Sequence, residues 1–504
     1  MEITTSSPGA EAGATAALLS VVLDRAGREP LGRQLYLRVR DLILLGRLAG
    51  GARLPSSRRL ADDLGVSRTV TLAAYDQLTV EGYLEAQRGS GHYVKALKRQ
   101  APGPPRPAEH PRGAAPAPVE VLLAAPRGRP FDSDAPASDL FPTRLWARMM
   151  ARGWRREGLA AAGLGDWAGL ASLRGAIAGY LRGLQGIDCA ADQVVITAGN
   201  ADALQLITRG LGGAGAQIWV EDPGHVGARQ TLRREGLKVV PVPVDAEGLD
   251  VAAGRRLAPR ARFALVTPAR QFPTGAPLSL PRRVALIDWA HETDAVVIAD
   301  DYDSELRFAG RPVAALSSLD RRGVVLSIGS FSRVTFPGLR LGYIVGSAAL
   351  IAPLVQARAR EGSPVATGAQ PALAEFIGGG GLAKHLRGLR RRMGQRRDAL
   401  ADALRARLGE AVTVEPQEVG QHLVVTLGPG LAGRASDVEI AALATARGLS
   451  LDPLSNHAAA LPGRQGFLLG YAGWDEAVLL AGVEALAKVL AQVEAQRPRC
   501  ESPR

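Results

Sequence analysis

Residues 54–94 read LPSSRRLADDLGVSRTVTLAAYDQLTVEGYLEAQRGSGHYV and contain two short helical patterns separated by a glycine. Ser56 is placed to cap a first helix, because a serine hydroxyl accepts a hydrogen bond from the free amides of the first turn. Gly65 allows a tight turn, and Ser67 can cap a second helix at residues 68–78. This spacing predicts a helix-turn-helix.

A hairpin follows the second helix directly. Residues 82–85 and 91–94 are short strand-like runs on either side of the glycine-containing segment 87–90. Within the second helix, we expect Leu72 and Leu78 to face the core of this unit. A helix-turn-helix followed by such a hairpin is a winged helix.

An amphipathic helix precedes this segment. Leu35, Val39, Leu42 and Ile43 follow the i, i+4, i+7, i+8 spacing of one helix face, and Gly46 helps to end the helix. The pattern adds a third helix to the unit.

The groups expected on the surface of this unit suit double-stranded DNA. Ser67, Arg68 and Thr69 lie in the first turn of the second helix, where an arginine can fork to guanine O6 and N7 in the major groove. Arg58 flanks the groove, and Arg88 at the wing tip can reach the adjacent backbone or minor groove. The combined pattern predicts a DNA-binding domain.

Five segments of this unit resemble the signature of the GntR family of bacterial regulators: LGRQL at 31–35, RLPSSR at 53–58, VSR at 66–68, GYL at 82–84 and GSG at 89–91. The resemblance implies that the chain binds an operator. It implies that the operator-contacting positions are Arg58, Ser67, Arg68, Thr69, Arg88 and Gly89.

Length and charge agree with a chain of several domains that meets a polyanion. The 504 residues carry a formal net charge of +12, and five lysines stand among 61 basic residues. Arginine-rich codon usage is the simplest explanation of that imbalance. Residues 101–130 hold nine of the 33 prolines, a composition typical of a linker. We expect these parts: a tail at 1–24, the winged helix at 25–96, the linker at 97–130, a large domain at 131–495 and a tail at 496–504.

Cysteine usage and hydropathy favour a cytoplasmic protein. Cys189 and Cys500 are the two cysteines, too few for a disulfide scaffold or a multi-cysteine zinc site, so no metal site is expected. The apolar run at residues 16–23 is too short to span a bilayer. We therefore expect no membrane partner.

The region after the linker alternates apolar runs with amphipathic helices, which predicts an α/β domain with a mainly parallel sheet. The runs lie at 193–197, 217–220, 237–242, 263–266, 295–299 and 324–328. Polar clusters follow them, at the strand ends where ligands bind in such sheets. These clusters lie at 197–200, 221–225, 267–275, 300–303 and 330–333.

In this order the clusters resemble a fold type I aminotransferase, the fold of transferases that depend on pyridoxal phosphate, and residues 131–146, 170–174 and 336–343 match it further. With the winged helix in front, residues 20–490 are similar to the MocR subgroup of GntR regulators. The resemblance implies a homodimer and a pyridoxal phosphate site. The implied positions are Asn200, Ala201, His225, Asp300, Tyr302, Ser330, Ser332, Arg333 and Arg340.

Arg333 departs from the family in the decisive place. It stands where the resemblance implies the lysine of a Ser-Phe-Ser-Lys pattern, and a guanidinium is not a competent amine for a stable aldimine. Lys95, Lys98, Lys238, Lys384 and Lys488 all lie outside the motif, so a covalent link to the cofactor is not expected. We therefore assign no catalytic residue.

Other departures fall in the same region. By the resemblance, Arg270 replaces a histidine, His225 a tyrosine, and Leu468 an arginine for the substrate carboxylate. Asp202 places a negative charge near the implied phosphate site. Drift in an unused site and refitting for an acidic ligand both explain these changes.

The sequence thus predicts an N-terminal winged helix-turn-helix joined to an α/β fold type I transferase-like domain. The main hypothesis is a DNA-binding regulator, rather than an enzyme in its own right, whose large domain dimerises and senses a small anionic or amino-acid-like effector. The alternatives are a regulator that holds pyridoxal phosphate without a covalent bond, residual aminotransferase activity, and a large domain that acts only as a dimer scaffold.

Overall fold

The computed structural model describes residues 18, 21–25, 29–87, 90–96, 128–158, 162–308, 314–415, 418–431, 433–460 and 464–495. The chain divides into two units, Met1–Pro118 and Val119–Arg504, with the division inside the predicted linker. Most of that linker, residues 97–127, lies outside the described residues, as do both chain ends. Each unit is described by itself.

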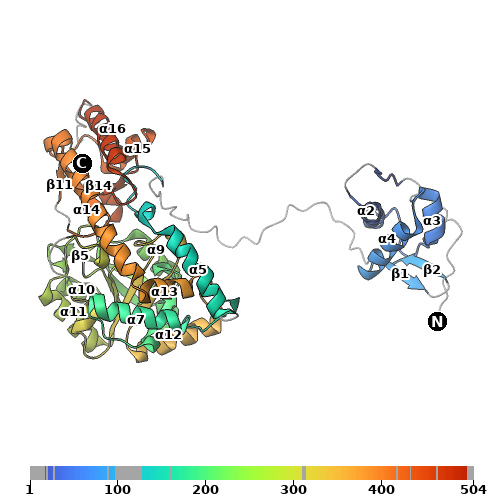
Figure 1. The fold of residues 1–504 in the computed structure, drawn as a ribbon, viewed down its shortest axis with the longest axis horizontal. Helices are drawn as coiled ribbons and strands as arrows, with labels where there is room; N and C mark the ends of the chain where they lie inside the picture. Colours follow the sequence, from blue (N-terminus) through green and yellow to red (C-terminus); the bar gives the residue numbers. More distant parts are fainter. Residues whose placement is uncertain are drawn as a thin grey trace. The chain divides into compact units, whose positions relative to one another are not determined.

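The first unit is a winged helix-turn-helix (Figure 1). Its elements are α2 (Leu31–Leu44), α3 (Ser57–Leu64), α4 (Arg68–Val80), β1 (Leu84–Gln87) and β2 (Gly91–Val94). The two strands pair antiparallel, from Leu84 opposite Val94 to Gln87 opposite Gly91. The first strand therefore begins two residues later than predicted and reaches the wing tip.

The sequence signals for the turn act as expected, with one difference. The hydroxyl of Ser56 caps α3 by accepting a hydrogen bond from the amide of Arg59 at 3.3 Å, and Gly65 has φ +63°. Ser67 occupies the N-cap position of α4, but its side chain accepts no capping hydrogen bond. The hydroxyl of Ser67 is thus not used by the helix it begins.

The core of the first unit forms around α2 and α4. All four periodic residues of α2 are buried, and so is Leu18, which precedes the expected start of the domain. One expectation is wrong: Leu72 is 40% exposed. The buried face of α4 runs through Thr71, Ala74, Tyr75 and Leu78, and Thr71 can be buried because its hydroxyl donates to the carbonyl of Ser57 at 2.7 Å.

The second unit is built on an eight-stranded sheet of order β3-β10-β9-β8-β7-β4-β5-β6. Its strands are β3 (Val194–Thr197), β4 (Gln217–Asp222), β5 (Lys238–Asp245), β6 (Gly248–Leu249), β7 (Phe263–Val266), β8 (Val296–Asp300), β9 (Val325–Ser330) and β10 (Gly342–Val345). Strands β5, β4, β7, β8 and β9 are parallel neighbours, whereas β10 runs antiparallel to β9 and β3. The mainly parallel sheet is confirmed, and β10 is a strand that the apolar pattern did not predict.

Helices cover both faces of this sheet, because consecutive strand residues point to opposite sides. One face packs on α8 (Asn200–Gly210), α9 (Val226–Arg234) and α12 (Ala348–Glu361). The other packs on α10 (Val251–Leu257) and α11 (Leu280–Thr293) toward β5. Toward β3 it packs on α7 (Ala171–Gln185), α13 (Gln370–Gly378) and α14 (Gly381–Leu408), beside α5 (Thr143–Glu157).

A second, four-stranded antiparallel sheet of order β11-β12-β14-β13 completes this unit. It comprises β11 (Val412–Val414), β12 (His422–Leu427), β13 (Asp452–Pro453) and β14 (Gly466–Gly470), with α15 (Asp437–Ala446) and α16 (Glu476–Glu494). Helix α16 lies beside α14 (Figure 1). The start of β12 brings His422 to the carboxyl ends of the large sheet, where it contacts Arg270.

Candidate functional site

The predicted DNA-contacting side chains of the first unit lie on its surface. Arg58 on α3 and the first-turn residues Ser67, Arg68 and Thr69 of α4 are all exposed. Neither the Arg58 nor the Arg68 guanidinium is engaged by another described residue, so both are available to a ligand. Arg88 and Gly89 lie outside the described residues. The wing beside them is held by a 2.6 Å hydrogen bond between the hydroxyls of Ser90 and Tyr93.

In the second unit the five polar clusters come together at one edge of the sheet. Strands β3, β4, β7, β8 and β9 all run in one direction, because β10 is antiparallel to both β3 and β9. Their carboxyl ends therefore share an edge, as predicted for a ligand site.

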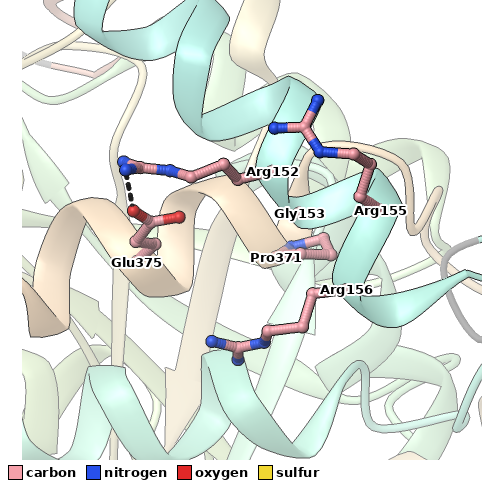
Figure 2. A pocket seen from close by; sticks show the side chains of 6 residues that line it. All are labelled: Arg152, Gly153, Arg155, Arg156, Pro371 and Glu375. Carbon is pink, nitrogen blue, oxygen red and sulfur yellow. Dashed lines mark ion pairs between the residues drawn. The ribbon is translucent and has the colours of Figure 1, made fainter.

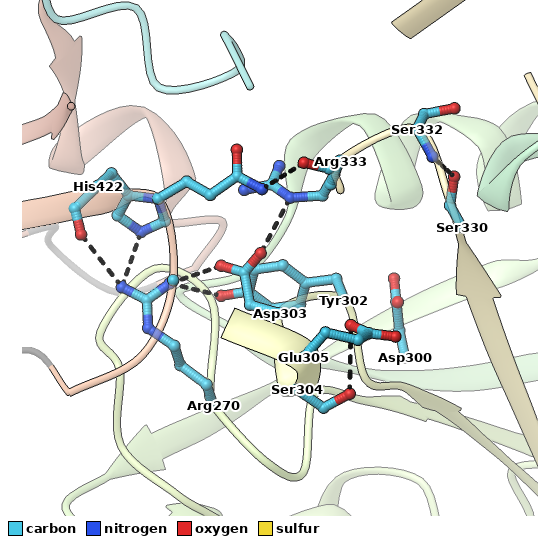
Figure 3. Close-up of polar contacts among 12 residues, drawn as sticks. Arg270, Asp300, Tyr302, Asp303, Ser304, Glu305, Ser330, Ser332, Arg333 and His422 are labelled. Atoms are coloured by element: carbon cyan, nitrogen blue, oxygen red, sulfur yellow. Dashed lines mark hydrogen bonds and ion pairs between the residues drawn. The ribbon is translucent and has the colours of Figure 1, made fainter. Parts of the chain in front are cut away.

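Arg333, in the segment after β9, is held by a carboxylate from the segment after β8. Its Nε donates to Oδ1 of Asp303 at 3.1 Å, and the guanidinium carbon lies 5.3 Å from the centre of the Tyr302 ring (Figure 3). The side chain of Asp303 is fully buried, whereas that of Arg333 is 25% exposed. The Nη2 atom of Arg333 is buried without a hydrogen-bond partner among the described residues. The two N–H groups of this Nη2 atom are thus left for a ligand.

A second arginine reaches the same carboxylate. Nη1 of Arg270 lies 3.2 Å from Oδ2 of Asp303 and donates to the hydroxyl of Tyr302 at 3.2 Å (Figure 3). Asp303 therefore bridges two guanidiniums, and the three groups together carry an excess of one positive charge. Burial raises the pKa of Tyr302 above its ordinary value, so the phenol keeps its proton and can donate it elsewhere.

His422 also contacts Arg270. Nη2 of Arg270 lies 3.2 Å from Nε2 of His422, and because an arginine can only donate, Nε2 must be the acceptor. Burial, followed by the charges of Arg270 and Arg333, holds the pKa of His422 well below its usual range. The ring is neutral with its proton on Nδ1, and that buried Nδ1 has no partner in the described part of the chain.

The segment leading into β12 also contacts these groups. Gln421 donates to the carbonyl of Arg333 at 3.0 Å, and Tyr471 donates to the carbonyl of Gly420 at 2.6 Å. Gly420 has φ +106°, and a Cβ there would lie 2.5 Å from Nη1 of Arg270. Sequence reasoning missed Gln421 and His422 because no motif marks them, and it placed Asp303 in a polar cluster without giving it a role.

Asp300 and Asn200, two of the predicted cofactor positions, contact each other directly. Nδ2 of Asn200 lies 3.0 and 2.9 Å from the two carboxylate oxygens of Asp300, while its own buried Oδ1 has no partner among the residues that the structure describes. Burial and the neighbouring Asp301 raise the pKa of Asp300 to about 7. The carboxyl group therefore exchanges its proton near neutral pH.

The positions implied for a phosphate group surround the start of α8. Ala201 lies in its first turn, and the guanidinium of Arg340 lies 3.8 Å from the point that a Cβ on Gly199 would take. Arg340 is exposed, and the hydroxyl of Ser330 accepts a hydrogen bond from the amide of Ser332 at 3.3 Å. A helix N-terminus, hydroxyls and an arginine form a donor set suited to an anion.

Asp202 does not add a free negative charge to this set. Its carboxylate forms an ion pair with Arg358 at 2.8 Å and accepts from the amide of Ala198 at 2.9 Å. Both contacts orient the start of α8.

His225 and Leu468 both pack near Phe272. His225 caps α9 by accepting from the amide of Ala228 at 3.0 Å, and its ring centre lies 5.3 Å from that of Phe272. Leu468 is fully buried and packs with Val424 and Phe272. Apolar packing therefore occupies the position at which an arginine was implied.

The described lysines all lie outside the five polar clusters in the sequence. Lys95 follows β2, Lys238 begins β5, and Lys384 and Lys488 lie in α14 and α16, and all four side chains are exposed. Lys98 falls outside the described residues. Within the described part of the chain, no group of histidine, cysteine and acidic residues could hold a metal ion, and no helix has the length and hydropathy of a membrane span.

Two family profiles match the chain. The profile of the "Bacterial regulatory proteins, gntR family" matches residues 31–94, and that of "Aminotransferase class I and II" matches residues 137–449. Together with the fold, these matches define a helix-turn-helix transcriptional regulator that carries an aminotransferase-like domain.

Relatives with both parts place the chain more closely. It is 36% identical over 94% of its length to the probable rhizopine catabolism regulatory protein MocR of Rhizobium meliloti, covering 96% of that protein. It is 32% identical over 88% of its length to the pyridoxine biosynthesis transcriptional regulator PdxR of Corynebacterium glutamicum, covering 93% of that protein. The chain belongs to the MocR-type regulators of the GntR family.

Solved structures resemble the second unit. One is LysN, an alpha-aminoadipate aminotransferase from Thermus thermophilus complexed with N-(5'-phosphopyridoxyl)-L-leucine, with a TM-score of 0.64 and 28% identity over 72% of this chain and 92% of that chain. The kynurenine aminotransferase of Pyrococcus horikoshii gives a TM-score of 0.65 at 26% identity, over 72% of this chain and 90% of that chain. Pyridoxal phosphate is thus the cofactor of the family whose fold this unit has.

Proposed function

We propose that the chain reads its operator through Arg58, Ser67, Arg68 and Thr69, with Arg88 and Gly89 of the wing as further contacts. The exposed guanidinium of Arg68, in the first turn of α4 and unengaged by any described residue, carries this assignment. From that position an arginine fits guanine in the major groove. Two winged helices, one from each chain of a homodimer, would read two half-sites.

Footprinting on DNA upstream of the chain's own coding sequence tests this assignment. We expect protection of a defined site that weakens steeply as salt is raised, because phosphate contacts release counterions. Binding of equal strength to all sequences, with no protected site, would refute operator recognition.

We propose further that the large domain forms no covalent bond to pyridoxal phosphate and performs no transamination. The observation that carries this proposal is the side chain at position 333: a guanidinium, held by Asp303 and stacked over Tyr302. A guanidinium stays protonated and offers no free amine. The four described lysines are exposed, and none of them lies in the segment 330–333 after β9.

The same domain is proposed to dimerise and to sense a small anionic or amino-acid-like effector. Arg270 and Arg333 share one buried carboxylate, so these three groups keep an excess of one positive charge, and no described residue accepts a hydrogen bond from Nη2 of Arg333. A carboxylate of a ligand would satisfy both. A thermal-shift comparison of small carboxylic acids with their methyl esters tests the idea, since a ligand bound only to the native state raises its stability. Equal shifts for acid and ester would contradict it.

A second candidate function is non-covalent binding of pyridoxal phosphate, and the donor set fits that group. When bound, the cofactor supplies an electron-withdrawing pyridine ring and a phosphate. Asp300 would pair with the ring nitrogen, Tyr302 would donate to the ring oxygen, and Arg340, Ser330, Ser332 and the α8 amides would hold the phosphate. The unsatisfied Oδ1 of Asn200 and the raised pKa of Asp300 favour a polar ligand beside them.

Titration with pyridoxal phosphate separates this candidate from an anion-only site. Stabilisation by pyridoxal phosphate, with no lysine labelled after borohydride reduction, supports non-covalent binding. If inorganic phosphate stabilises the chain as much at equal concentration, the ring makes no contribution and the candidate fails. Residual transamination predicts product formation from an amino acid and a keto acid, which we do not expect.

A further inference from the structure

Helix α5 carries five arginines on one side. Its exposed basic residues are Arg144, Arg148, Arg152, Arg155 and Arg156. At about 100° per residue these positions fall within an arc of about 120°, over about 18 Å of helix. This arc lies next to the buried side of α5, which packs on the core through Met149 and Gly153.

The rest of the exposed surface of α5 is uncharged. Ala147 and Ala151 lie on it together with Trp154, which is 46% exposed. Glu157, at the end of the helix, is paired with Arg156 at 3.3 Å. The charge of the helix is therefore gathered along one stripe, whereas a generally solvated helix would mix both signs around its outer surface.

Part of this arginine stripe lines a depression between α5 and α13. The depression has a volume of about 470 Å³ and is lined by Arg152, Arg155 and Arg156 together with Gly153, Pro371 and Glu375 (Figure 2). Glu375 is its one acidic group among the described residues and already pairs with Arg152. The two helices approach closely at Gly153. A Cβ on this residue would lie 2.9 Å from the Cβ of Pro371.

Three of the five guanidiniums are unpaired. Arg144, Arg148 and Arg155 have no hydrogen bond or ion pair with any other residue that the structure describes. Unpaired arginines on one side of a helix, one and two turns apart, suit a polyanion, since each can fork to a phosphate group.

We propose that the arginine stripe of α5 binds the phosphate backbone of duplex DNA next to the operator, as a second DNA contact separate from the winged helix. The contact carries no sequence information and adds affinity through counterion release. The proposal rests on DNA binding by the first unit, and the two can fail separately.

The chain's own architecture makes duplex DNA the partner that meets this stripe. A winged helix bound to its site holds the same DNA molecule at high local concentration around the second unit. The linker at 97–130 sets a reach of at most about 120 Å when fully extended. Flanking duplex of modest length is therefore accessible to α5, and weak phosphate contacts become effective.

The test compares two DNA lengths with the full-length chain. The variant Arg144→Gln/Arg148→Gln/Arg155→Gln removes the three unpaired charges from an exposed surface. On a duplex with long flanks we expect weaker binding and a shallower salt dependence. The slope should fall by about 0.9 for each phosphate that the variant no longer binds, up to about three phosphates. On a duplex trimmed to the protected site, variant and wild type should bind alike.

A charge-matched control keeps this result specific to the stripe. Arg233→Gln/Arg234→Gln/Arg256→Gln removes three exposed charges from α9 and α10 and should leave binding to both duplexes unaffected. Equal salt slopes for the α5 variant and wild type on long DNA overturn the proposal, and so does an equal weakening in the control. A change in oligomeric state of the α5 variant overturns it too, because the stripe would then serve contacts between two copies. If Arg68→Ala is the only variant that weakens binding to the trimmed duplex, that loss belongs to the winged helix and not to the stripe.

Discussion

The two units differ in how closely their functional residues match those of the families they resemble. In the winged helix, the residues that fold it and the residues proposed to contact DNA lie in one segment, and the exposed arginines of α3 and α4 are available to a ligand. In the aminotransferase-like unit the sheet and its polar strand ends are present. At the implied cofactor site, however, Arg333 and Arg270 form ion pairs with the buried carboxylate of Asp303. A fold is specified by many apolar positions, whereas a chemistry can be lost through a single side chain.

The largest expected effect comes from the buried carboxylate between the two arginines. Asp303→Asn keeps the shape of the side chain but leaves two guanidiniums without a counter-charge, one of them 3% exposed. We expect the free energy of unfolding of the large unit to fall by about 3–5 kcal/mol in denaturant titrations. Asp288→Asn, at an exposed position of α11, is the control and should change it by less than about 0.5 kcal/mol. A similar small change for Asp303→Asn would mean that the ion pairs are not formed.

The next effect concerns DNA binding by the winged helix. Arg68→Ala removes the proposed guanine contact from α4 and should weaken operator binding by about 1–3 kcal/mol, or roughly fivefold to 150-fold, while binding to unrelated DNA changes little. Fluorescence anisotropy on specific and unrelated duplexes measures both. Arg38→Ala, exposed on α2, is the control. Equal weakening on both duplexes would make Arg68 a phosphate contact.

A smaller effect concerns Asp300 and pH. Its pKa, raised to about 7, means that the folded chain holds this proton more tightly than the unfolded chain, in which a carboxyl ionises near pH 4. The contribution to stability is present below about pH 4 and is lost as the pH rises to about 7, on the order of 1 kcal/mol or more.

Unfolding of wild type and Asp300→Asn across this window measures that contribution. The variant should lose less stability between pH 4 and 7. Some slope should remain, since burial also raises the pKa values of Glu221 and Glu305 to about 7. Parallel pH profiles for the two proteins would show that Asp300 is ionised throughout.

Local patterns predicted most of the fold, because each element depends on neighbouring residues. The cap at Ser56, the turn at Gly65 and the apolar face of α2 act as predicted. The prediction for Leu72 was wrong because one leucine does not define which face of α4 is buried. The buried face includes the polar residue Thr71, whose hydroxyl is hydrogen-bonded there. Strand β10 was missed because its first two residues, Gly342 and Tyr343, were assigned to the motif at 336–343, which left only Ile344 and Val345 as an apolar run.

The site was predicted only in part, because its contacts join residues far apart in the sequence. The strand-end rule located Asp300, Tyr302 and Arg333. Asp303 as the shared partner of two arginines, and His422 from the second sheet as a neutral acceptor, depend on how the two sheets meet. No local spacing encodes that meeting.

We propose that Arg333, standing in place of a lysine, removes the covalent chemistry of an otherwise intact fold. The most direct measurement is incubation of the full-length chain with pyridoxal phosphate, reduction with borohydride, and peptide mapping by mass spectrometry, for wild type and for Arg333→Lys. We predict no stoichiometrically labelled lysine in wild type, and labelling at position 333 in the variant with a visible absorption band. Full labelling of a single lysine in the wild-type chain would contradict the account.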